Sequence, residues 1–353
     1  MESKLSFNFK TNQEILKLIG FIDVFKGRWK QIEGKESRYL KELRLIATIE
    51  SIGSSTRIEG SKMSNEEVED FVNAINITSF KSRDEQEVFG YYDTLNLILE
   101  SHKSISLSKN HIHQLHKNLL NKSTKDNRHR GNYKTLSNKV VANYPGGKQK
   151  VIFNTTEIHL VSQEMETAIE WTTNAIKNEE IHPLIAIGAF IYEFLSIHPY
   201  QDGNGRLSRL LTTLLLLKSD YDFIQYASME YEIEKEKKEY YKALMAGQKN
   251  RYSKTEKIDK WILFFLNTLK NTINKLESIY AQIKDKKSYL NQRQSEVLNY
   301  IINREPIKIS DLTNALKEYT PYILKKDVKY LVDEGLVRKI GKGRATTYIS
   351  NQK

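Results

Sequence analysis

Apolar residues recur at intervals of three and four from Gln13 to about Leu120, the spacing that places them along one face of a helix. The stretch YLKELRLIATIESI is typical of this pattern. Ser64 followed by Glu67 has the form of a capping box, which predicts that a helix opens there. Ser108 is expected to cap a later helix. This part of the chain is therefore predicted to be helical.

The helical pattern breaks over residues 136–154. Two runs of strand-forming residues flank the turn sequence YPGGK there, and together they predict a short hairpin. Helical spacing returns over residues 158–178. Residues 183–197 are apolar on nearly every face, which predicts a helix buried at the centre of the fold, and Pro183 suits its first turn. RLSRLLTTLLLLK is expected to form its partner helix.

The composition changes at Leu290. Three helical segments, NQRQSEVLNYIINR, KISDLTNAL and TPYILKKDVKYLVDEGLV, are followed by two short strands joined by GKGR. Three helices and a β-wing predict a winged helix-turn-helix domain over residues 290–353. Residues 251–289 are then expected to be a helical connector.

Composition narrows the class of protein. The chain has 353 residues, of which 39% are hydrophobic and 28% charged, and only 5 are proline, a mixture typical of a soluble helical protein. It has no run of eighteen apolar residues and no leader-like N-terminus, so neither a membrane span nor export is expected. Cysteine is absent, which excludes disulfides and fits a cytoplasmic location. The net charge of +11 favours anionic partners such as nucleotides or nucleic acid.

The segment IHPYQDGNGRLSRLL, residues 197–211, interrupts two apolar helices with polar residues. Gly203 and Gly205 allow a ligand to approach the main chain, and the free N–H groups of the next helix form a ready anion site. Arg206 and Arg209 lie three apart on that helix, and guanidinium groups are preferred partners of phosphate oxygens. The segment therefore predicts a polyphosphate site.

Two further residues of the segment are candidates for a metal ligand and a general base. Asp202 would repel phosphate unless a Mg²⁺ ion bridged the two, so we expect it to be a magnesium ligand. His198 is the natural general base for a hydroxyl nucleophile. Tyr200 is interpreted as core packing. Base, metal ligand and anion site together predict nucleotidyl or phosphoryl transfer.

HPYQDGNGRLSR resembles the signature of Fic domains, His-Pro-Phe-x-Asp/Glu-Gly-Asn-Gly-Arg-x-x-Arg, with Tyr200 where Phe is common. The resemblance covers roughly residues 100–250 and implies an all-α catalytic core, which we place at residues 99–250, with the hairpin as a small flap. It implies transfer of AMP from ATP to a Ser, Thr or Tyr hydroxyl of a target protein, with pyrophosphate leaving. A branch of this fold that transfers phosphate carries Lys at the place of Gly205 and lacks the second arginine, so Gly205 and Arg209 favour AMP transfer.

The resemblance also assigns roles within the motif. His198 deprotonates the hydroxyl and Asp202 holds Mg²⁺. The phosphate-binding residues that it implies are Gly203, Asn204, Gly205, Arg206 at the β-phosphate and Arg209 at the γ-phosphate.

Two segments outside the motif also have counterparts in the family. The hairpin resembles the flap that docks targets, so Val151, Ile152 and Phe153 are expected to lie near the nucleotide. Tyr240 occupies the place where relatives contact adenine. Gln248 stands where Asn is usual.

SSTRIEG, residues 54–60, resembles the Fic inhibitory motif Ser/Thr-x-x-x-Glu-Gly/Asn. Ser55 and Glu59 are four apart and share one helix face. If Glu59 reaches Arg209, its carboxylate occupies the place of the γ-phosphate and ATP binds in a non-productive pose. Residues 1–98 are thus expected to be a helical region that carries an inhibitory helix.

The C-terminal domain suggests a second class of partner. Residues 290–353 contain 12 Lys or Arg and 7 Asp or Glu. Lys325, Lys326 and Lys329 on the expected recognition helix, with Lys342 and Arg344 at the wing tip, would contact DNA phosphates. Protein contacts or dimerisation are the alternative for this domain.

Two rival functions remain at this point. The first is a DNA-binding regulator whose Fic part only senses nucleotide. The second is an enzyme that removes AMP from targets, with Glu59 positioning water. The sequence leaves the oligomeric state open; a homodimer is one candidate, since dimers are frequent in similar proteins.

Overall fold

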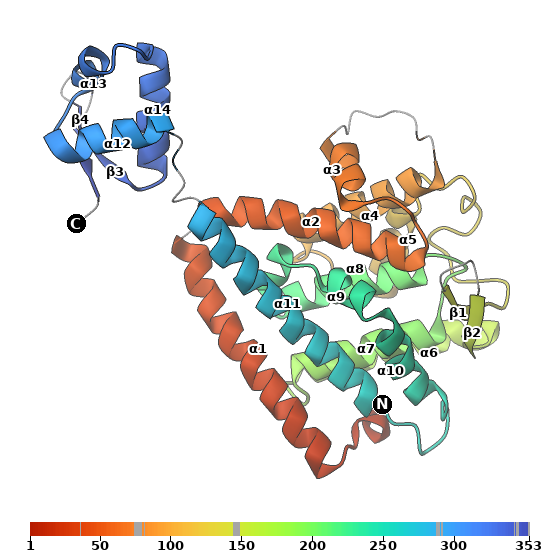
Figure 1. The fold of residues 1–353 in the computed structure, drawn as a ribbon. Helices are drawn as coiled ribbons and strands as arrows, with labels where there is room; N and C mark the ends of the chain where they lie inside the picture. Colours follow the sequence, from red (N-terminus) through yellow and green to blue (C-terminus); the bar gives the residue numbers. More distant parts are fainter. Residues whose placement is uncertain are drawn as a thin grey trace. The chain divides into compact units, whose positions relative to one another are not determined.

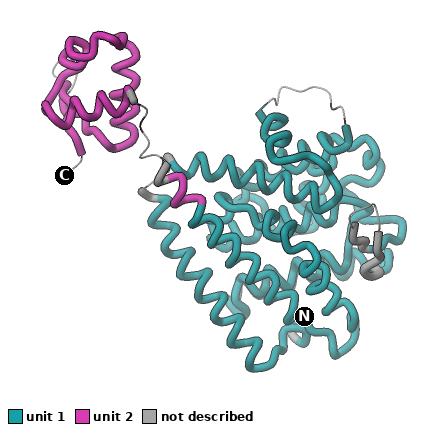
Figure 2. Tube along the Cα trace, viewed as in Figure 1, with its two compact units in different colours: residues 1–278 teal, residues 279–353 magenta. Residues whose placement is uncertain are grey.

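The computed structural model describes residues 1–35, 37–73, 80, 82–143, 149–286, 290, 292–341, 343 and 346–351. The chain divides into two units, residues 1–278 and 279–353 (Figure 2). The predicted boundaries after residues 98 and 250 stay predictions.

The first unit is mostly helical, with one small antiparallel sheet (Figure 1). Its elements are η1 (Glu2–Leu5), α1 (Phe9–Lys35), α2 (Ser37–Glu59), α3 (Asn65–Asn73), α4 (Arg83–Ser101), α5 (Lys109–Leu119), β1 (Lys139–Asn143), β2 (Gln149–Asn154), η2 (Ile158–Leu160), α6 (Val161–Lys177), α7 (Pro183–Ile197), α8 (Asn204–Lys218), η3 (Asp222–Tyr226), α9 (Met229–Lys235) and α10 (Lys237–Gln248), followed by α11 (Asp259–Lys286), whose last residues, from 279 on, belong to the second unit.

The predicted helix starts are confirmed by their caps. Glu67 donates its backbone N–H to the Ser64 hydroxyl at 3.2 Å, and its carboxylate accepts from the Ser64 N–H at 2.8 Å. These reciprocal bonds satisfy two donors that the first turn of α3 leaves free. Ser108 caps α5 by accepting from the backbone N–H of His111.

Helix α7 lies in the core of the first unit, as its apolar sequence predicts. Almost every residue from Leu184 to Ile197 is buried, and the helix packs against α6 and α8. Pro183 takes the first helical position. A Cβ atom added at Gly188 would come within 3.0 Å of Ile262 on α11, so α11 approaches α7 closely at this glycine. Helix α7 is thereby packed by α6, α8 and α11.

The predicted hairpin is confirmed as β1 paired antiparallel with β2. Lys139 pairs with Asn154 and Asn143 with Gln149, and the register shifts between Val140 and Val141. The turn, residues 144–148, lies outside the described residues.

The second unit contains the predicted sequence of three helices and two strands: α12 (Gln292–Arg304), α13 (Ile309–Ala315), α14 (Pro321–Asp333), β3 (Val337–Ile340) and β4 (Thr347–Ser350). Val297, Leu312, Leu324 and Val337 belong to its core. Assignment to the winged helix class stays a prediction, and Lys342 and Arg344 lie outside the described residues.

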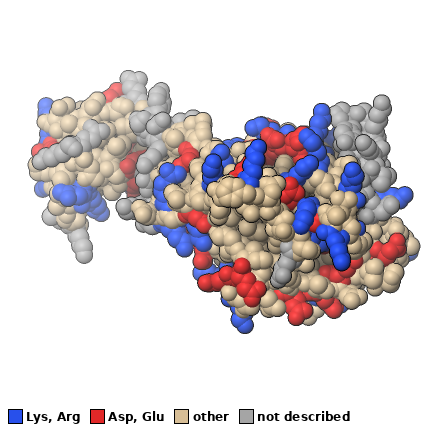
Figure 3. All heavy atoms as spheres, turned by 90° about the horizontal axis from the view of Figure 1, so that it is seen from below, with Lys and Arg blue, Asp and Glu red and all other residues tan. Residues whose placement is uncertain are grey.

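Two features of the surface and helices bear on the expected partners. On the face shown in Figure 3, Lys and Arg side chains alternate with Asp and Glu and form no continuous basic surface. The net positive charge therefore does not mark a binding surface on that face. Within the described part of the chain, every helix is too short or too polar to cross a membrane.

Candidate functional site

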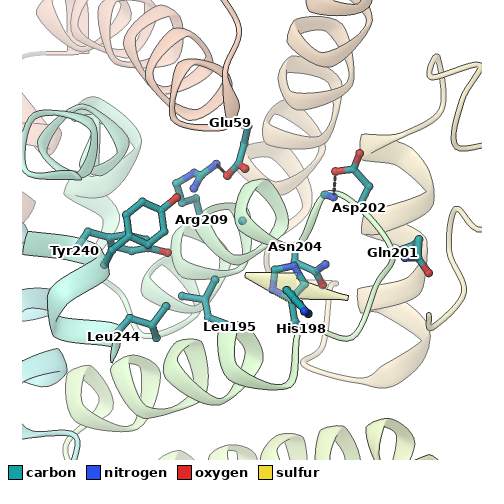
Figure 4. Close-up of a pocket in the computed structure, with 13 residues that line it drawn as sticks. Glu59, Leu195, His198, Gln201, Asp202, Asn204, Arg209, Tyr240 and Leu244 are labelled. Atoms are coloured by element: carbon teal, nitrogen blue, oxygen red, sulfur yellow. Dashed lines mark hydrogen bonds and ion pairs between the residues drawn. The ribbon is translucent and has the colours of Figure 1, made fainter. Parts of the chain in front are cut away.

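A pocket of about 220 Å³ lies where the end of α2, the α7–α8 loop and α10 meet (Figure 4). Most of the residues predicted from the motif and the inhibitory sequence line this one pocket. The lining residues are Glu59, Lys139, Leu195, His198, Gln201, Asp202, Gly203, Asn204, Gly205, Arg209, Tyr240, Tyr241 and Leu244.

The α7–α8 loop turns sharply at both ends. His198 ends α7 in the left-handed conformation, with φ 52° and ψ 60°. Gly203 precedes α8 with φ 80°, a backbone angle that favours glycine. The first N–H groups of α8 have no partner within the helix and lie at the pocket, which makes this end suited to an anion.

The loop is held by side chains that sequence reasoning missed or assigned otherwise. His116 on α5 accepts from the N–H of Gly131 at 2.8 Å through Nδ1, so its Nε2 donates to the carbonyl oxygen of Asp202 at 2.9 Å. Its ring stacks on Tyr200, with centroids 3.7 Å apart. Tyr200 is fully buried, in agreement with its predicted packing role.

The side chain of Asn204 is engaged within the loop, and its role at phosphate stays a prediction. Its amide oxygen accepts from the N–H of Tyr200 at 2.9 Å, and its amide nitrogen donates to the carbonyl oxygen of Tyr200 at 2.7 Å. The side chain therefore closes the loop, and only the backbone at Asn204 is free to face an anion. A sequence motif does not tell whether this side chain bonds to the loop or to phosphate, because an amide can form hydrogen bonds with both.

His198 has the properties of a neutral imidazole. Burial, with the nearby Lys134 ammonium, lowers the pKa of His198 to about 4. Its Nδ1 atom is buried and has no hydrogen-bond partner among the described residues. At neutral pH the ring is thus unprotonated and able to accept a proton.

Asp202 lies between two groups of cations. Its Oδ1 accepts from the N–H of Gly203 at 2.6 Å and from Arg206 at 3.2 Å. Its Oδ2 lies 3.7 Å from the ammonium of Lys125 and 4.0 Å from Arg83. Burial raises the pKa of Asp202, but Arg206 and the other cations outweigh burial and hold it below its usual range. The carboxylate is therefore ionised and ready to meet a cation.

Arg206 is buried behind the loop and does not line the pocket. It lies 3.4 Å from the carboxylate of Glu87 on α4, a residue that the motif does not reveal. Its Nε and Nη1 atoms have no hydrogen-bond partner among the described residues. The guanidinium thus keeps unused donors beside Asp202.

Arg209 is bound to the predicted inhibitory helix. It donates to the Ser55 hydroxyl at 2.7 Å, to the Ser55 carbonyl oxygen at 3.0 Å and to Glu59 Oε1 at 2.9 Å (Figure 4). Burial raises the pKa of Glu59, but the charges of Arg209 and Arg206 and the hydrogen bond from Arg209 together outweigh burial and lower it, so the carboxylate is ionised. A Cβ atom at Gly205 would lie 2.2 Å from Glu59 Oε1, which shows how closely Glu59 approaches the start of α8.

The end of α2 is anchored to α9 and α10. Arg57 donates to both carboxylate oxygens of Glu234 on α9, at 2.7 and 2.9 Å. Lys237, at the start of α10, donates to the carbonyl oxygen of Ile58 at 2.7 Å. These contacts fix the helix turn that carries Glu59.

The remaining predicted site residues fall on α10 and the hairpin. Tyr240 is buried at the pocket with its ring against Trp261 and Phe264, and burial raises its pKa. Gln248 donates to Ser196 and does not line the pocket. The backbone of residues 151–153 belongs to β2, but the side chains of Val151, Ile152 and Phe153 lie outside the description.

The carboxylate of Asp202 could serve a magnesium ion that arrives with a nucleotide, in exchange for its present contacts with Arg206 and Lys125. Among the described residues there is no cluster of three or more His, Asp or Glu that would hold a metal by itself. Mg²⁺ is commonly bound by one or two carboxylates together with substrate phosphates and water. Asp202 is suited to such a shared site.

Comparison with known proteins relates this pocket to one family. Residues 106–216 match the model of the Fic/DOC family. Over 86 residues, or 24% of this chain and 2% of the relative, the sequence is 29% identical to the protein adenylyltransferase and cysteine protease IbpA of Histophilus somni. The chain thus spans only a small fraction of that relative's length.

Solved structures share the fold. A Fic family protein from Desulfovibrio desulfuricans G20 superimposes with a TM-score of 0.64 at 20% identity, covering 99% of this chain and 98% of its own. A Fic domain containing signalling protein from Bacteroides thetaiotaomicron gives a TM-score of 0.55 at 18% identity, covering 75% of this chain and 97% of its own. Fic-1 from C. elegans gives a TM-score of 0.54 at 17% identity, covering 77% of this chain and 73% of its own.

Proposed function

We propose that the Fic domain of this chain transfers AMP from ATP to a Ser, Thr or Tyr hydroxyl of a target protein. The observation that carries the proposal is the pocket that brings together His198, Asp202, the start of α8 and Arg209. A base, a metal ligand, an anion-binding helix end and a buried guanidinium are the groups that such a transfer needs. The matched family model and the adenylyltransferase relative support the same reaction.

In this proposal the triphosphate lies against the start of α8. The backbone N–H groups of Asn204 and Gly205 bind phosphate oxygens, joined by that of Gly203 once it leaves Asp202, and Arg209 pairs with the γ-phosphate. Arg206, which is buried and does not line the pocket, would act on the β-phosphate side through its charge. Tyr240 and Leu244 provide the wall for adenine. Magnesium held by Asp202 would neutralise phosphate charge.

His198 acts as the general base. The neutral imidazole accepts the proton of the target hydroxyl, and the oxygen attacks the α-phosphorus of ATP. A bond forms between that oxygen and the α-phosphorus, while the bond from the α-phosphorus to the bridging oxygen breaks. Pyrophosphate leaves with the electron pair. The products are the AMP-modified target and pyrophosphate.

Glu59 is proposed to inhibit this reaction. Its carboxylate holds Arg209 at 2.9 Å and lies against Gly205, so it occupies space that the γ-phosphate requires. A carboxylate there also repels phosphate. The inhibited state is the one in which α2 keeps these contacts.

The test is radiolabelled AMP incorporation with Mg²⁺ and ATP. Glu59→Gly is expected to raise incorporation, on the protein itself and on captured targets, by at least about tenfold, the equivalent of about 1.4 kcal/mol. His198→Ala in the Glu59→Gly background is the matched control and is expected to bind ATP without transfer. No gain in the Glu59→Gly form would overturn the inhibitory role, and turnover without His198 would remove it from the chemistry.

The hairpin is proposed to dock the target. Its sheet has only two strands, so each has an outer edge able to pair with an extended segment. Lys139, the first residue of β1, lines the pocket and links the hairpin to the site. Pairing on this edge would bring a hydroxyl toward His198.

A second function, DNA binding, is proposed for the C-terminal unit. Lys325, Lys326 and Lys329 are exposed on α14, and Tyr322, 76% exposed, completes the same face at helical spacing. Such a face contacts phosphates through salt-sensitive pairs. Replacing the three lysines by glutamate is expected to abolish binding to duplex DNA in a salt titration. Unchanged binding would contradict the proposal.

A further inference from the structure

Lys134 is a buried lysine that the proposed chemistry does not use. It lies between α5 and β1 and is 2% exposed. Its ammonium donates to Asn138 Oδ1 at 2.9 Å, to the Thr155 hydroxyl at 2.7 Å and to the carbonyl oxygen of Ile197 at 3.2 Å. All three N–H donors of the ammonium are therefore satisfied.

The three acceptors belong to three separate segments. Asn138 immediately precedes β1, and Thr155 immediately follows β2. Ile197 is the last residue of α7, and its carbonyl carbon is bonded to the nitrogen of His198. One ammonium thus joins both ends of the hairpin to the peptide bond that leads into His198.

The same segment satisfies two more carbonyl groups of the loop. The backbone N–H of Lys134 donates to the carbonyl oxygen of Pro199 at 2.8 Å. The side-chain amide of Asn138 donates to the carbonyl oxygen of Tyr200 at 2.8 Å. Carbonyl groups at a helix C-terminus lack partners within the helix, so donors from elsewhere decide where this turn lies.

We infer that Lys134 is a positioning residue that fixes His198 relative to the target-docking hairpin. The inference rests on the proposed AMP transfer for its kinetic consequence, although the contacts stand without it. Lys134 does not line the pocket, so it acts through the backbone at His198 and through the ends of β1 and β2. Lys134 would thereby fix the position of the His198 imidazole relative to a target hydroxyl docked on the hairpin.

The charge of Lys134 also acts on His198. After burial, Lys134 is the strongest influence that lowers the pKa of His198, whereas Glu59 and Asp202 raise it. Loss of the ammonium charge is expected to move the pKa of His198 upward. A role in folding alone would not produce this shift.

The kinetic test uses the full chain in the Glu59→Gly form. Lys134→Met is expected to lower kcat for AMP transfer roughly 10- to 100-fold, since a small misplacement of reacting groups has effects of this size. KM for ATP is expected to stay within about threefold. Lys134→Arg, which keeps the charge and donors, is expected to restore part of the turnover. Lys177→Met, at an exposed lysine on α6, is the matched control.

Thr155→Val offers a milder variant should Lys134→Met fail to fold. It removes one acceptor of the ammonium at nearly constant volume and is expected to lower kcat roughly threefold with KM unchanged. Turnover within twofold of the parent in both variants overturns the inference. An equal loss of ATP affinity and turnover overturns it too.

A second readout separates this inference from the proposed reaction. The pKa of His198 is measured by NMR of histidine-labelled full chain, with His198→Ala to assign the signal. Lys134→Met is expected to raise it and Lys134→Arg to leave it unchanged. If the Glu59→Gly form transfers no AMP, the proposed function fails. In that case the pKa of His198 is the remaining test. A higher pKa in Lys134→Met supports the link between Lys134 and His198, and an unchanged pKa overturns it.

Discussion

At the scale of single residues, Gly205 lies where Glu59 approaches the start of α8, the same place that the proposed phosphate site uses. A side chain at this position would meet Glu59 Oε1 at 2.2 Å and Arg209 Nη1 at 3.4 Å. The glycine is therefore required by the close approach of the carboxylate, and the position at the start of α8 would suit phosphate for the same reason.

This crowding predicts a coupling between Gly205 and Glu59. Gly205→Ala is expected to lower the free energy of unfolding by about 1–3 kcal/mol in the otherwise unchanged chain, because the methyl group displaces Glu59. In the Glu59→Gly form the loss should vanish or reverse, since alanine favours a helix by up to about 1 kcal/mol over glycine. Urea unfolding followed by tryptophan fluorescence reports on the first unit, which contains Trp29, Trp171 and Trp261. Equal effects in both backgrounds would contradict the coupling.

The pKa of His198 predicts an unusual pH profile. The folded pKa is lowered to about 4, so the base stays unprotonated as pH falls and is lost only when pH approaches that value. For the Glu59→Gly form, kcat/KM, which reports the free enzyme, should be nearly flat from about pH 8 to about pH 5.5. A fall in kcat/KM as pH drops through about 6.5 would show instead that His198 has the usual pKa of a histidine. Circular dichroism at each pH checks that the fold is intact.

Sequence reasoning named the charged and glycine residues of the α7–α8 loop that line the pocket, but not Lys139, Leu195, Gln201, Tyr241 or Leu244, and it missed the residues that hold the loop. Glu59 and Arg209 could be paired in advance because two short motifs name them. His116, Glu87 and Lys134 could not, because their partners lie 86 residues away in one case and 63 in another, at distances that a motif does not span. The resemblance implies Asn204 at phosphate but does not reveal that its side-chain amide is bonded to the backbone of Tyr200.

At the scale of elements, the orientation of α2 depends on α9 and α10. Helical spacing and the Ser64 cap predicted that helices form here. The pairing of Arg57 with Glu234 could not be predicted from the sequence. Charged residues on a helix are usually solvated, and the two residues are 177 positions apart. These contacts decide whether Glu59 stays at Arg209.

Weakening this anchor is expected to release inhibition without altering the pocket. Glu234→Gln should raise basal AMP transfer about 2- to 10-fold, the equivalent of about 0.5–1.4 kcal/mol for a partly buried ion pair. Glu239→Gln, which removes the partner of Lys242 in an exposed pair on α10, is the matched control. The measurement is labelled AMP incorporation in the chain that retains Glu59. If AMP incorporation rises in both variants, or in neither, the contact of α2 with α9 does not contribute to the inhibition by Glu59.

At the scale of the whole molecule, the site belongs to the first unit alone. Every residue that lines the pocket lies between Glu59 and Leu244, within residues 1–278. The composition change at Leu290 predicted a separate C-terminal part, and its helices and strands follow the predicted order. What that part binds is set by side chains on its surface, which a pattern of apolar positions does not specify.

Separate units predict separable activities. In the Glu59→Gly form, a chain that ends at residue 289 should transfer AMP at a rate within about twofold of the full chain, because each unit has its own core. The same chain should no longer bind duplex DNA. Filter binding and AMP incorporation on one preparation measure both. Loss of transfer on deletion would mean that the second unit supports the site.

If Glu59 inhibits as proposed, its contact with Arg209 makes it a competitor of the nucleotide that is tethered to the same chain. Its effective concentration at the site would be set by α2 and would not fall when the protein is diluted. The inhibited fraction would then be independent of how much protein a cell makes. A change in ATP concentration, or a partner that moves α2, would alter it.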